Sequence, residues 1–254
     1  MWHKVWDQLI SRFTLIAIDL RGYGRSSKPR GNDQHVNYSK RTMARDCVNV
    51  MSGLGYESFY ICAHDRGARV AHQLLVDYPA LVLKAILLDI CPTAAMYEAT
   101  NFNFAFSYYH WFFLIQPAPF PEEMILANPE AFLKRQTGRH LSGEGDVFAP
   151  EVYQSYLSML KNPAAVHAMC EDYRAAASID LEDQRQDAAQ GKKIRQPMLI
   201  LWGKKGVVQQ QFDAIAEWKK VSDSSVEGLA LDCGHYIPEE APAALLEQIF
   251  DFFS

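Results

Sequence analysis

The chain has 254 residues, of which 49% are hydrophobic and 12% aromatic. This length and apolar content are enough for one large domain, or for a core domain with an inserted subdomain. With 25 basic against 30 acidic residues and no basic cluster, the composition argues against a nucleic-acid-binding protein.

Cysteine usage and hydropathy bear on where the protein works. Five cysteines are scattered along the chain, and none forms a Cys-x-x-Cys pair. This predicts free thiols in a reduced, cytoplasmic protein and argues against a structural zinc site. The N-terminal residues lack the apolar core of a signal peptide. Residues 102–120 are the most apolar stretch, but polar residues and two prolines interrupt it, so it predicts a packed or pocket-lining segment rather than a membrane span.

Continuous apolar runs predict buried strands at residues 15–18, 59–62, 85–88 and 198–202, with a weaker one at 229–231. Helical patterns at 43–54, 66–78 and 212–220 lie between some of them. Strands that are apolar throughout and alternate with helices predict an α/β fold, with a doubly wound, mostly parallel sheet covered on both faces.

Residues 92–193 break this alternation, because they are rich in aromatic residues and helix-like segments and contain no clear strand. We interpret them as a helical cap inserted into a core made of residues 1–91 and 194–254. Ligands of open parallel sheets bind beyond the carboxyl ends of the strands. Asp65, Asp89 and His235 each follow a predicted strand, so we expect them to converge at that edge.

Asp65 lies at an abrupt strand-to-helix transition, between the small residues Ala63 and Gly67. This is the arrangement of a nucleophile elbow, although the chain has no Gly-x-Ser-x-Gly and places a carboxylate at the turn. A carboxylate attacks saturated carbon and forms an ester, which suits carbon–halogen bonds or epoxides better than ordinary esters. The alternative is that Asp65 merely caps the helix.

His235 follows the last predicted strand, on a Gly-His loop. In many hydrolases of this architecture such a histidine is the general base, and here it would activate the water that cleaves the ester. A loop histidine held by hydrogen bonds is the alternative. Asp89 is the expected acid that orients it, because the loop at 203–208 contains none. Asp213 is the second candidate, but it lies in a helix predicted to face solvent.

Arg66 and Arg69 lie in the first turn of the predicted helix, where the helix dipole disfavours cations. They are three residues apart and therefore share one face. Solvated side chains are one explanation. The other is that they clamp a substrate carboxylate beside Asp65, a task that suits the planar guanidinium, and that they favour the ionised form of Asp65.

Several motifs resemble those of fluoroacetate (haloacetate) dehalogenases of the α/β-hydrolase superfamily, and the resemblance runs along the whole chain. The motifs are His-Asp-Arg-Gly-Ala-Arg at 64–69, Leu-Asp-Ile-Cys-Pro-Thr at 88–93, Tyr-His-Trp-Phe at 109–112, Gln-Pro-Ala-Pro-Phe-Pro at 116–121, Cys-Glu-Asp-Tyr-Arg-Ala at 170–175 and Cys-Gly-His-Tyr-Ile-Pro-Glu-Glu at 233–240. Residues 19–29 resemble the superfamily's loop after an early strand.

The resemblance implies an α/β-hydrolase fold with a helical cap, and a homodimer. It also implies residue roles: Asp65 as nucleophile, His235 as base, Asp89 as orienting acid, Arg66 and Arg69 as carboxylate clamp, and His110, Trp111 and Tyr173 as halide pocket. The N–H and O–H donors of such a pocket would stabilise fluoride as it leaves. Without the resemblance, an aromatic cap core explains the pocket residues.

The family's chains begin earlier, with opening strands and a His-Gly-x-Pro loop that donates an oxyanion-hole amide. This sequence starts just after that motif, so we expect the sheet to lack its N-terminal strands and the Arg66 amide to be the remaining oxyanion donor. A truncated gene model, an internal start codon and a genuine short form all explain such a start.

The sequence supports three hypotheses. The first is a hydrolytic dehalogenase of short 2-haloacids such as fluoroacetate, which needs a small-molecule substrate and water but no cofactor, metal, nucleic acid or membrane. The second is an epoxide hydrolase with the same aspartate and histidine, although the paired arginines argue against it. The third is an inactive, truncated or binding-only protein. The proton donors for the second hypothesis would be Tyr108, Tyr109, Tyr153, Tyr156 and Tyr173.

Overall fold

The computed structural model describes residues 1–138 and 147–254. Its centre is a four-stranded parallel sheet with the strand order β1-β2-β3-β4. The strands are β1 (Phe59–His64), β2 (Val82–Leu88), β3 (Met198–Gly203) and β4 (Val226–Leu231). The predicted α/β fold with a parallel sheet is confirmed, as are the strands predicted at 59–62, 85–88, 198–202 and 229–231.

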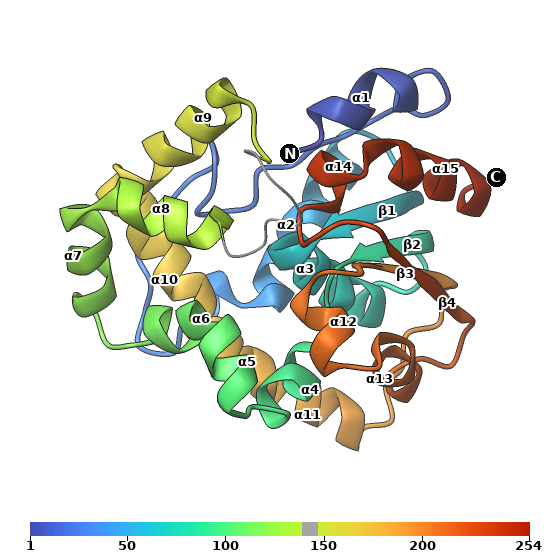
Figure 1. Cartoon of the computed structure of the whole chain (residues 1–254). Helices are drawn as coiled ribbons and strands as arrows, with labels where there is room; N and C mark the ends of the chain where they lie inside the picture. Colours follow the sequence, from blue (N-terminus) through green and yellow to red (C-terminus); the bar gives the residue numbers. More distant parts are fainter. Residues whose placement is uncertain (139–146) are drawn as a thin grey trace.

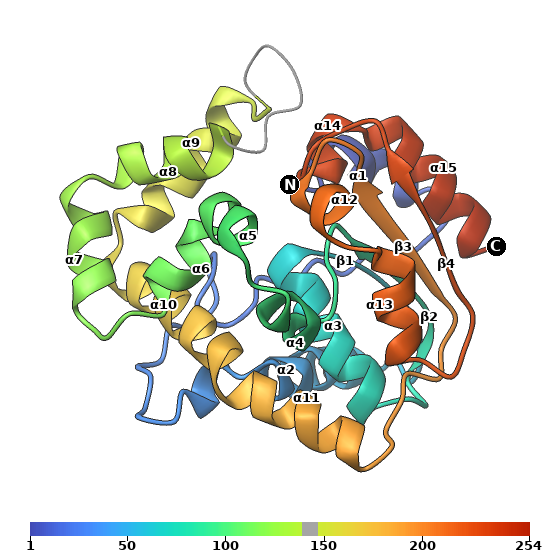
Figure 2. The same ribbon diagram turned by 60° about the horizontal axis from the view of Figure 1, so that its bottom comes forward.

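Helices cover both faces of the sheet (Figures 1 and 2). One face packs against α2 (Lys40–Gly53), α3 (Asp65–Asp77), α12 (Val207–Gln211) and α13 (Ala214–Lys220), and the other against α1 (His3–Leu9), α14 (Ile237–Glu240) and α15 (Pro242–Phe252). Successive side chains of a strand point to opposite faces. In β2, Ala85 and Leu87 therefore enter the first core, whereas Ile86 and Leu88 enter the second. Burial on both sides explains why this strand is apolar throughout.

Side-chain caps mark where two of the predicted helices begin. The hydroxyl of Ser39 accepts a hydrogen bond from the N–H of Thr42 and caps α2. Asp213 caps α13 in the same way, accepting from the N–H of Ala216 at 2.9 Å. Asp213 is exposed there. The carboxylate of Asp213, the second candidate acid, therefore acts as the N-cap of α13.

The strand predicted at residues 15–18 is wrong. These residues join no sheet, and Ala17 is exposed while its neighbours are only half-buried. An apolar run becomes a strand only when a neighbouring strand satisfies its N–H and C=O groups. Among the described residues no strand lies beside this segment, and β1 is the edge of the sheet.

Between β2 and β3, residues 92–138 and 147–193 form helices and no strand, as expected for the predicted cap. The helices are α4 (Thr93–Glu98), α5 (Phe102–Ser107), α6 (Tyr109–Leu114), α7 (Phe120–Ala127), α8 (Pro129–Gly138), α9 (Pro150–Leu160), α10 (Pro163–Ala177) and α11 (Ile179–Ala189). In both views α6–α10 lie together beside the core, and α10 also contacts the short helix η1 (Val36–Tyr38). No helix within the described ranges is long and apolar enough to cross a membrane.

Candidate active site

Asp65 and Asp89 occupy strained backbone positions at the ends of β1 and β2. Their φ angles are 45° and 52°, in the left-handed region that residues other than glycine seldom adopt. Such strain persists only where the surrounding structure enforces it, and it clusters at functional sites. His64 occupies the N-cap position of α3. The structure therefore does not give Asp65 the alternative role of helix cap.

His235 connects the two carboxylates. Its Nδ1 lies 2.6 Å from Oδ2 of Asp89, and its Nε2 lies 3.7 Å from Oδ2 of Asp65. Asp89 is fixed on its other side, because its Oδ1 accepts a hydrogen bond from the N–H of Gly203 at 2.9 Å. The expected convergence of Asp65, Asp89 and His235 is confirmed. With Nδ1–H donating to Asp89, Nε2 faces Asp65 and any water beside it.

The loop that carries His235 is held tightly against β3 and β1. A Cβ atom on Gly203 would lie 2.0 Å from the carbonyl oxygen of Gly234, so this approach requires glycine. Nε2 of His64 lies 2.7 Å from the carbonyl oxygen of His235, to which it donates. Burial and the nearby His235 lower the pKa of His64 to about 4, so His64 stays neutral while it holds this loop.

The charges of the site depend on one another. Burial opposes protonation of His235, but the contacts with Asp65 and Asp89 outweigh it and raise the pKa of His235 to about 9. Burial also opposes ionisation of Asp65, yet His235, His64 and Arg69 hold the pKa of this carboxyl well below its ordinary range. At neutral pH the resting site therefore contains an Asp65 carboxylate beside a His235 imidazolium.

Arg66 is paired with Asp172 of α10, an acid to which the sequence had assigned no role in the site. Nε and Nη2 of Arg66 each lie 2.7 Å from one carboxylate oxygen of Asp172. The carboxylate also accepts from the hydroxyl of Tyr23 at 2.5 Å and from Nζ of Lys40. Burial opposes its charge, but Arg66 and Lys40 hold the pKa of Asp172 far below its ordinary range. Bidentate pairing fixes the plane of the guanidinium.

Among the described residues, Arg69 forms no hydrogen bond to an acid. Its Nη1 donates to Oγ1 of Thr93 at 2.9 Å, and its other hydrogen bonds go to the carbonyl oxygen of Cys91 and to Sδ of Met96. The guanidinium lies over the ring of Trp111, with its central carbon 4.6 Å from the centroid. Burial, followed by repulsion from Arg66, lowers the pKa of Arg69. The charge of Arg69 is therefore costly in this conformation.

Each arginine also keeps one unused donor. Nη1 of Arg66 and Nε of Arg69 are buried and have no hydrogen-bond partner in the part of the chain that the structure describes. A buried unsatisfied donor typically costs about 1–3 kcal/mol, and more when it belongs to a charged group. The two donors belong to side chains on the first turns of α3, the end of a helix that favours anions.

A cavity of about 140 Å³ opens beside Asp65. The wall of this cavity does not include Arg66, Arg69 or Trp111. Arg66 lies directly behind the wall, because its guanidinium carbon is 4.2 Å from the centroid of the Tyr173 ring. The sequence did not predict the apolar part of this wall, because its residues come from separate helices between β2 and β3. The lining residues are Asp65, Tyr108, His110, Leu114, Phe132, Gln136, Met169, Tyr173, His235 and Tyr236.

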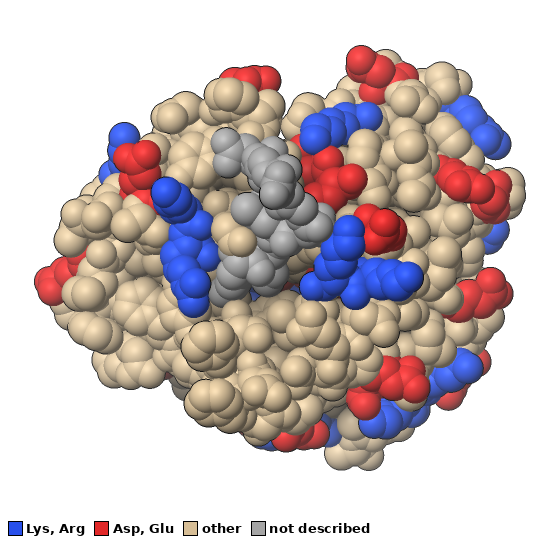
Figure 3. Space-filling model, viewed as in Figure 1, with Lys and Arg blue, Asp and Glu red and all other residues tan. Residues whose placement is uncertain are grey.

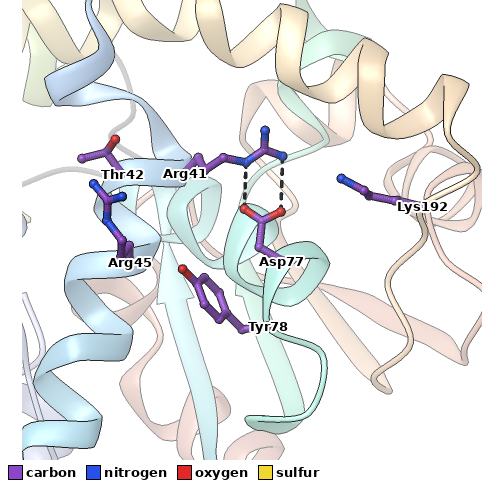
Figure 4. A pocket seen from close by; sticks show the side chains of 6 residues that line it. All are labelled: Arg41, Thr42, Arg45, Asp77, Tyr78 and Lys192. Atoms are coloured by element: carbon purple, nitrogen blue, oxygen red, sulfur yellow. Dashed lines mark hydrogen bonds and ion pairs between the residues drawn. The ribbon is translucent and has the colours of Figure 1, made fainter.

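A larger cavity of about 420 Å³ lies between α2 and α3, outside this site (Figure 4). It is lined by Arg41, Thr42, Arg45, Asp77, Tyr78 and Lys192. Arg41 is already paired with Asp77 through two hydrogen bonds of 2.9 and 3.2 Å, and it also contacts Asp183 and Asp187. This cavity lacks a nucleophile with an adjacent base, so the smaller one is the candidate active site. In residues 1–138 and 147–254, no cluster of three or more His, Cys, Asp or Glu could hold a metal ion.

A carboxylate on a strand-to-helix turn and a late loop histidine backed by an acid, on a parallel sheet, are the features of an α/β-class hydrolase. A family model described as alpha/beta hydrolase fold matches residues 1–242, and the chain belongs to this family.

The curated relatives that match the whole chain include a dehalogenase and an epoxide hydrolase. The chain is 37% identical over 254 residues to a fluoroacetate dehalogenase from Burkholderia sp, covering 83% of it. It is 28% identical over 255 residues to a soluble epoxide hydrolase from Corynebacterium sp. (strain C12), covering 85% of that protein. Among solved structures, "a putative alpha/beta hydrolase" from Nostoc sp PCC 7120 is 48% identical with a TM-score of 0.94, over 100% of this chain and 86% of that one.

Proposed function

We propose that the protein is a hydrolytic dehalogenase of short 2-haloacids such as fluoroacetate. The observation that carries this proposal is the pair of buried guanidinium groups, Arg66 and Arg69, each with an unused N–H donor at the helix start that bears Asp65. A neutral substrate would leave both donors unsatisfied. A carboxylate is the planar, bidentate acceptor that guanidinium groups recognise best.

Charge repulsion makes these cations necessary for such a reaction. The nucleophile Asp65 and a 2-haloacid are both anions, so they repel each other at the distance where the bond must form. Asp65 and Arg69 lie four residues apart at the start of α3, and the charge of Arg69 helps to lower the pKa of Asp65. We place the carboxylate of the acid toward Arg69 and its second carbon at Asp65.

The mechanism has two steps. In the first, an oxygen of Asp65 attacks the second carbon of the acid, forming an ester bond while the carbon–halogen bond breaks and halide leaves. In the second, His235 takes a proton from water, the resulting hydroxide attacks the ester carbonyl, and the 2-hydroxy acid leaves. Asp89 holds the imidazole in the orientation that this step needs, through its 2.6 Å contact with Nδ1.

The departing halide needs hydrogen-bond donors in a cavity that excludes water, since fluoride is poorly stabilised without such donors. His110 and Tyr173 line the cavity with Asp65, and we assign them to the halide. Trp111, the third residue expected there, is 2% exposed and packs under Arg69. In this conformation it supports the clamp, and it would meet the halide only if the cavity extended past His110.

Further support comes from the relatives and from the surface charge. A fluoroacetate dehalogenase is 37% identical over the whole chain.

On the face seen in Figure 3, Lys and Arg atoms (blue) lie on the cap side and on the core side of the grey atoms. Lys204 and Lys205 follow β3, and their N–H groups donate to the carbonyls of Leu231 and Cys233, just before the His235 loop. Such cations would attract an anionic substrate.

The second candidate function is hydrolysis of neutral epoxides, which uses the same aspartate and histidine. A soluble epoxide hydrolase is 28% identical. Of the tyrosines expected as proton donors, Tyr108 and Tyr173 line the cavity. The buried arginines disfavour this function, because an uncharged epoxide does not compensate them.

Purified protein supplied with fluoroacetate and with chloroacetate, followed by halide release, tests the proposal. We expect Arg69→Met to lower kcat/KM at least about a hundredfold, the effect of losing a charge-assisted hydrogen bond of about 3 kcal/mol. The control is Arg45→Met, since Arg45 is exposed on the other cavity. Cooperatively folding wild-type protein that releases no halide would favour the inactive or binding-only alternative.

We also propose that the enzyme works in the cytoplasm as a homodimer. All five cysteines are free thiols, as a reducing compartment favours. Two helices of the cap region expose apolar pairs one turn apart, Phe102 with Phe106 on α5 and Phe120 with Met124 on α7, which a second copy would cover. Sedimentation equilibrium tests the dimer, and a monomer at micromolar concentration would contradict it.

A further inference from the structure

We propose that this site also opens short epoxides that carry a carboxylate, such as glycidate, to give 2,3-dihydroxy acids. The inference rests on the carboxylate clamp of the proposed function, but not on the release of halide. It joins two features of one site: buried cations behind the cavity wall that favour an anion, and an O–H donor, Tyr173, that lines the cavity with Asp65.

Glycidate and a 2-haloacid present the same arrangement to Asp65. In both, the carbon next to the carboxylate carries the leaving atom, which is a halogen in one and the ring oxygen in the other. With the carboxylate at Arg66 and Arg69, attack at this carbon sends the leaving oxygen toward His110 and Tyr173, where the halide would go. The cavity of about 140 Å³ is small, which suits an acid only one non-hydrogen atom larger than chloroacetate.

The leaving oxygen needs a proton donor and halide does not, because an alkoxide must be protonated. A tyrosine hydroxyl, with an ordinary pKa of about 10, is acidic enough to give a proton to an alkoxide, whose conjugate acid is about as weak as water. Tyr173 lies in the cavity wall with Asp65, and the guanidinium of Arg66 covers its ring at 4.2 Å. A cation therefore faces the tyrosinate that proton transfer creates.

The bonds and protons of the reaction balance without a further reactant. Asp65 forms an ester bond to the second carbon of glycidate while the bond between that carbon and the ring oxygen breaks. The oxygen stays on the third carbon and takes the proton of Tyr173. Water then attacks the ester carbonyl with His235 as base, glycerate leaves, and the proton taken from water returns to the tyrosinate.

The test compares glycidate with glycidamide, a neutral epoxide of the same size, and with chloroacetate. We expect glycerate from glycidate, with kcat/KM at least about a hundredfold above that for glycidamide. In ¹⁸O-labelled water, a single turnover should give unlabelled glycerate, because the new oxygen comes from Asp65. Repeated turnovers should place label on the second carbon and none on the third. Equal rates for glycidate and glycidamide, or label on the third carbon, would overturn the inference.

The two proposals fail separately in this experiment. Halide release from chloroacetate with no glycerate from glycidate overturns the inference and leaves the dehalogenase standing. Glycerate formation without halide release does the reverse. If neither substrate is turned over, the carboxylate clamp on which both proposals depend is wrong.

Tyr173→Phe tests the assignment of the proton donor. Both activities should fall, but the ratio of glycidate to chloroacetate turnover should fall at least about tenfold further, because only the alkoxide needs a proton. The matched control is Tyr78→Phe, which removes a hydroxyl from the other cavity and should change neither rate. An equal loss of both activities in Tyr173→Phe would overturn the assignment.

Discussion

His235 changes its charge according to the state of Asp65. Its pKa of about 9 depends on the contacts with Asp65 and Asp89, which outweigh burial. When Asp65 becomes an ester, its negative charge disappears while burial still disfavours the imidazolium. The proposed first step therefore lowers the pKa of His235 and produces the neutral imidazole that the second step needs as base.

Replacing His235 by Gln should trap the ester. The first step needs no base, whereas the second does. We expect His235→Gln to release at most one halide per active site from chloroacetate and to gain the mass of one carboxymethyl group. Peptide mass spectrometry should place this mass on Asp65. The double variant Asp65→Asn/His235→Gln is the control and should stay unmodified.

The sequence predicts some of these residues but not others, for a physical reason. Asp65, Asp89 and His235 come directly after apolar runs, and parallel strands bring their carboxyl ends to one edge. Asp172 follows no strand, and its partner Arg66 is 106 residues away. The pair forms only when α10 and α3 meet in the folded chain, so no local sequence pattern predicts it.

At the scale of helices, Asp172 joins a helix of the region between β2 and β3 to two helices that cover the sheet, at the proposed carboxylate site. It brings α10 of the cap region against α3 through Arg66 and against α2 through Lys40, and all three side chains are buried. Lys40 also pairs with Asp180 of α11 at 3.1 Å. The orientation of Arg66, and with it the direction of its unused Nη1, is therefore set by a cap helix.

Asp172→Asn should weaken substrate binding more than its cost in stability explains. The amide cannot accept from both guanidinium nitrogens, so Arg66 loses its fixed orientation, and we expect KM for chloroacetate to rise at least tenfold. Breaking a buried pair costs about 3–5 kcal/mol, so the thermal midpoint should fall as well.

Asp180→Asn is the matched control, because Asp180 is equally buried and pairs with Lys40 but makes no hydrogen bond to Arg66. It should lower the thermal midpoint similarly while KM stays near the wild-type value. Equal rises of KM in both variants would mean that the network only holds the fold together.

The predicted elements succeeded where burial alone decides the structure. β2 and β3 lie inside the sheet, have neighbours on both sides and face two cores, so a run of apolar residues is sufficient to identify them. Residues 15–18 have a similar composition but no paired strand. Composition reports apolar side chains, whereas a strand also needs hydrogen-bond partners that only the assembled sheet supplies.

For the molecule as a whole, buried histidines make stability depend on pH in both directions. Burial and neighbouring cations lower the pKa of His64 and of His72 to about 4, from an ordinary value of 6.5. The unfolded chain therefore binds more protons than the folded one between pH 6.5 and 4, and stability falls as pH falls through this window. His235 has a raised pKa of about 9, so its contribution is complete below pH 6.5 and is lost as pH rises toward 9.

The thermal midpoint should accordingly be highest near pH 6.5 and fall more steeply on the acid side, where two histidines titrate against one. Each shift corresponds to roughly 3 kcal/mol over its window. His72 packs edge-on against Trp218, with the ring centroids 5.0 Å apart, and does not line the cavity, so His72→Gln removes one of the two titrating groups while the residues of the cavity wall stay in place. Calorimetry of this variant over a range of pH should show that the thermal midpoint falls less steeply on the acid side, because unfolding takes up about one proton fewer. The fall on the alkaline side should be unchanged. If both limbs match those of the wild type, His72 is not one of the groups that couple protonation to unfolding.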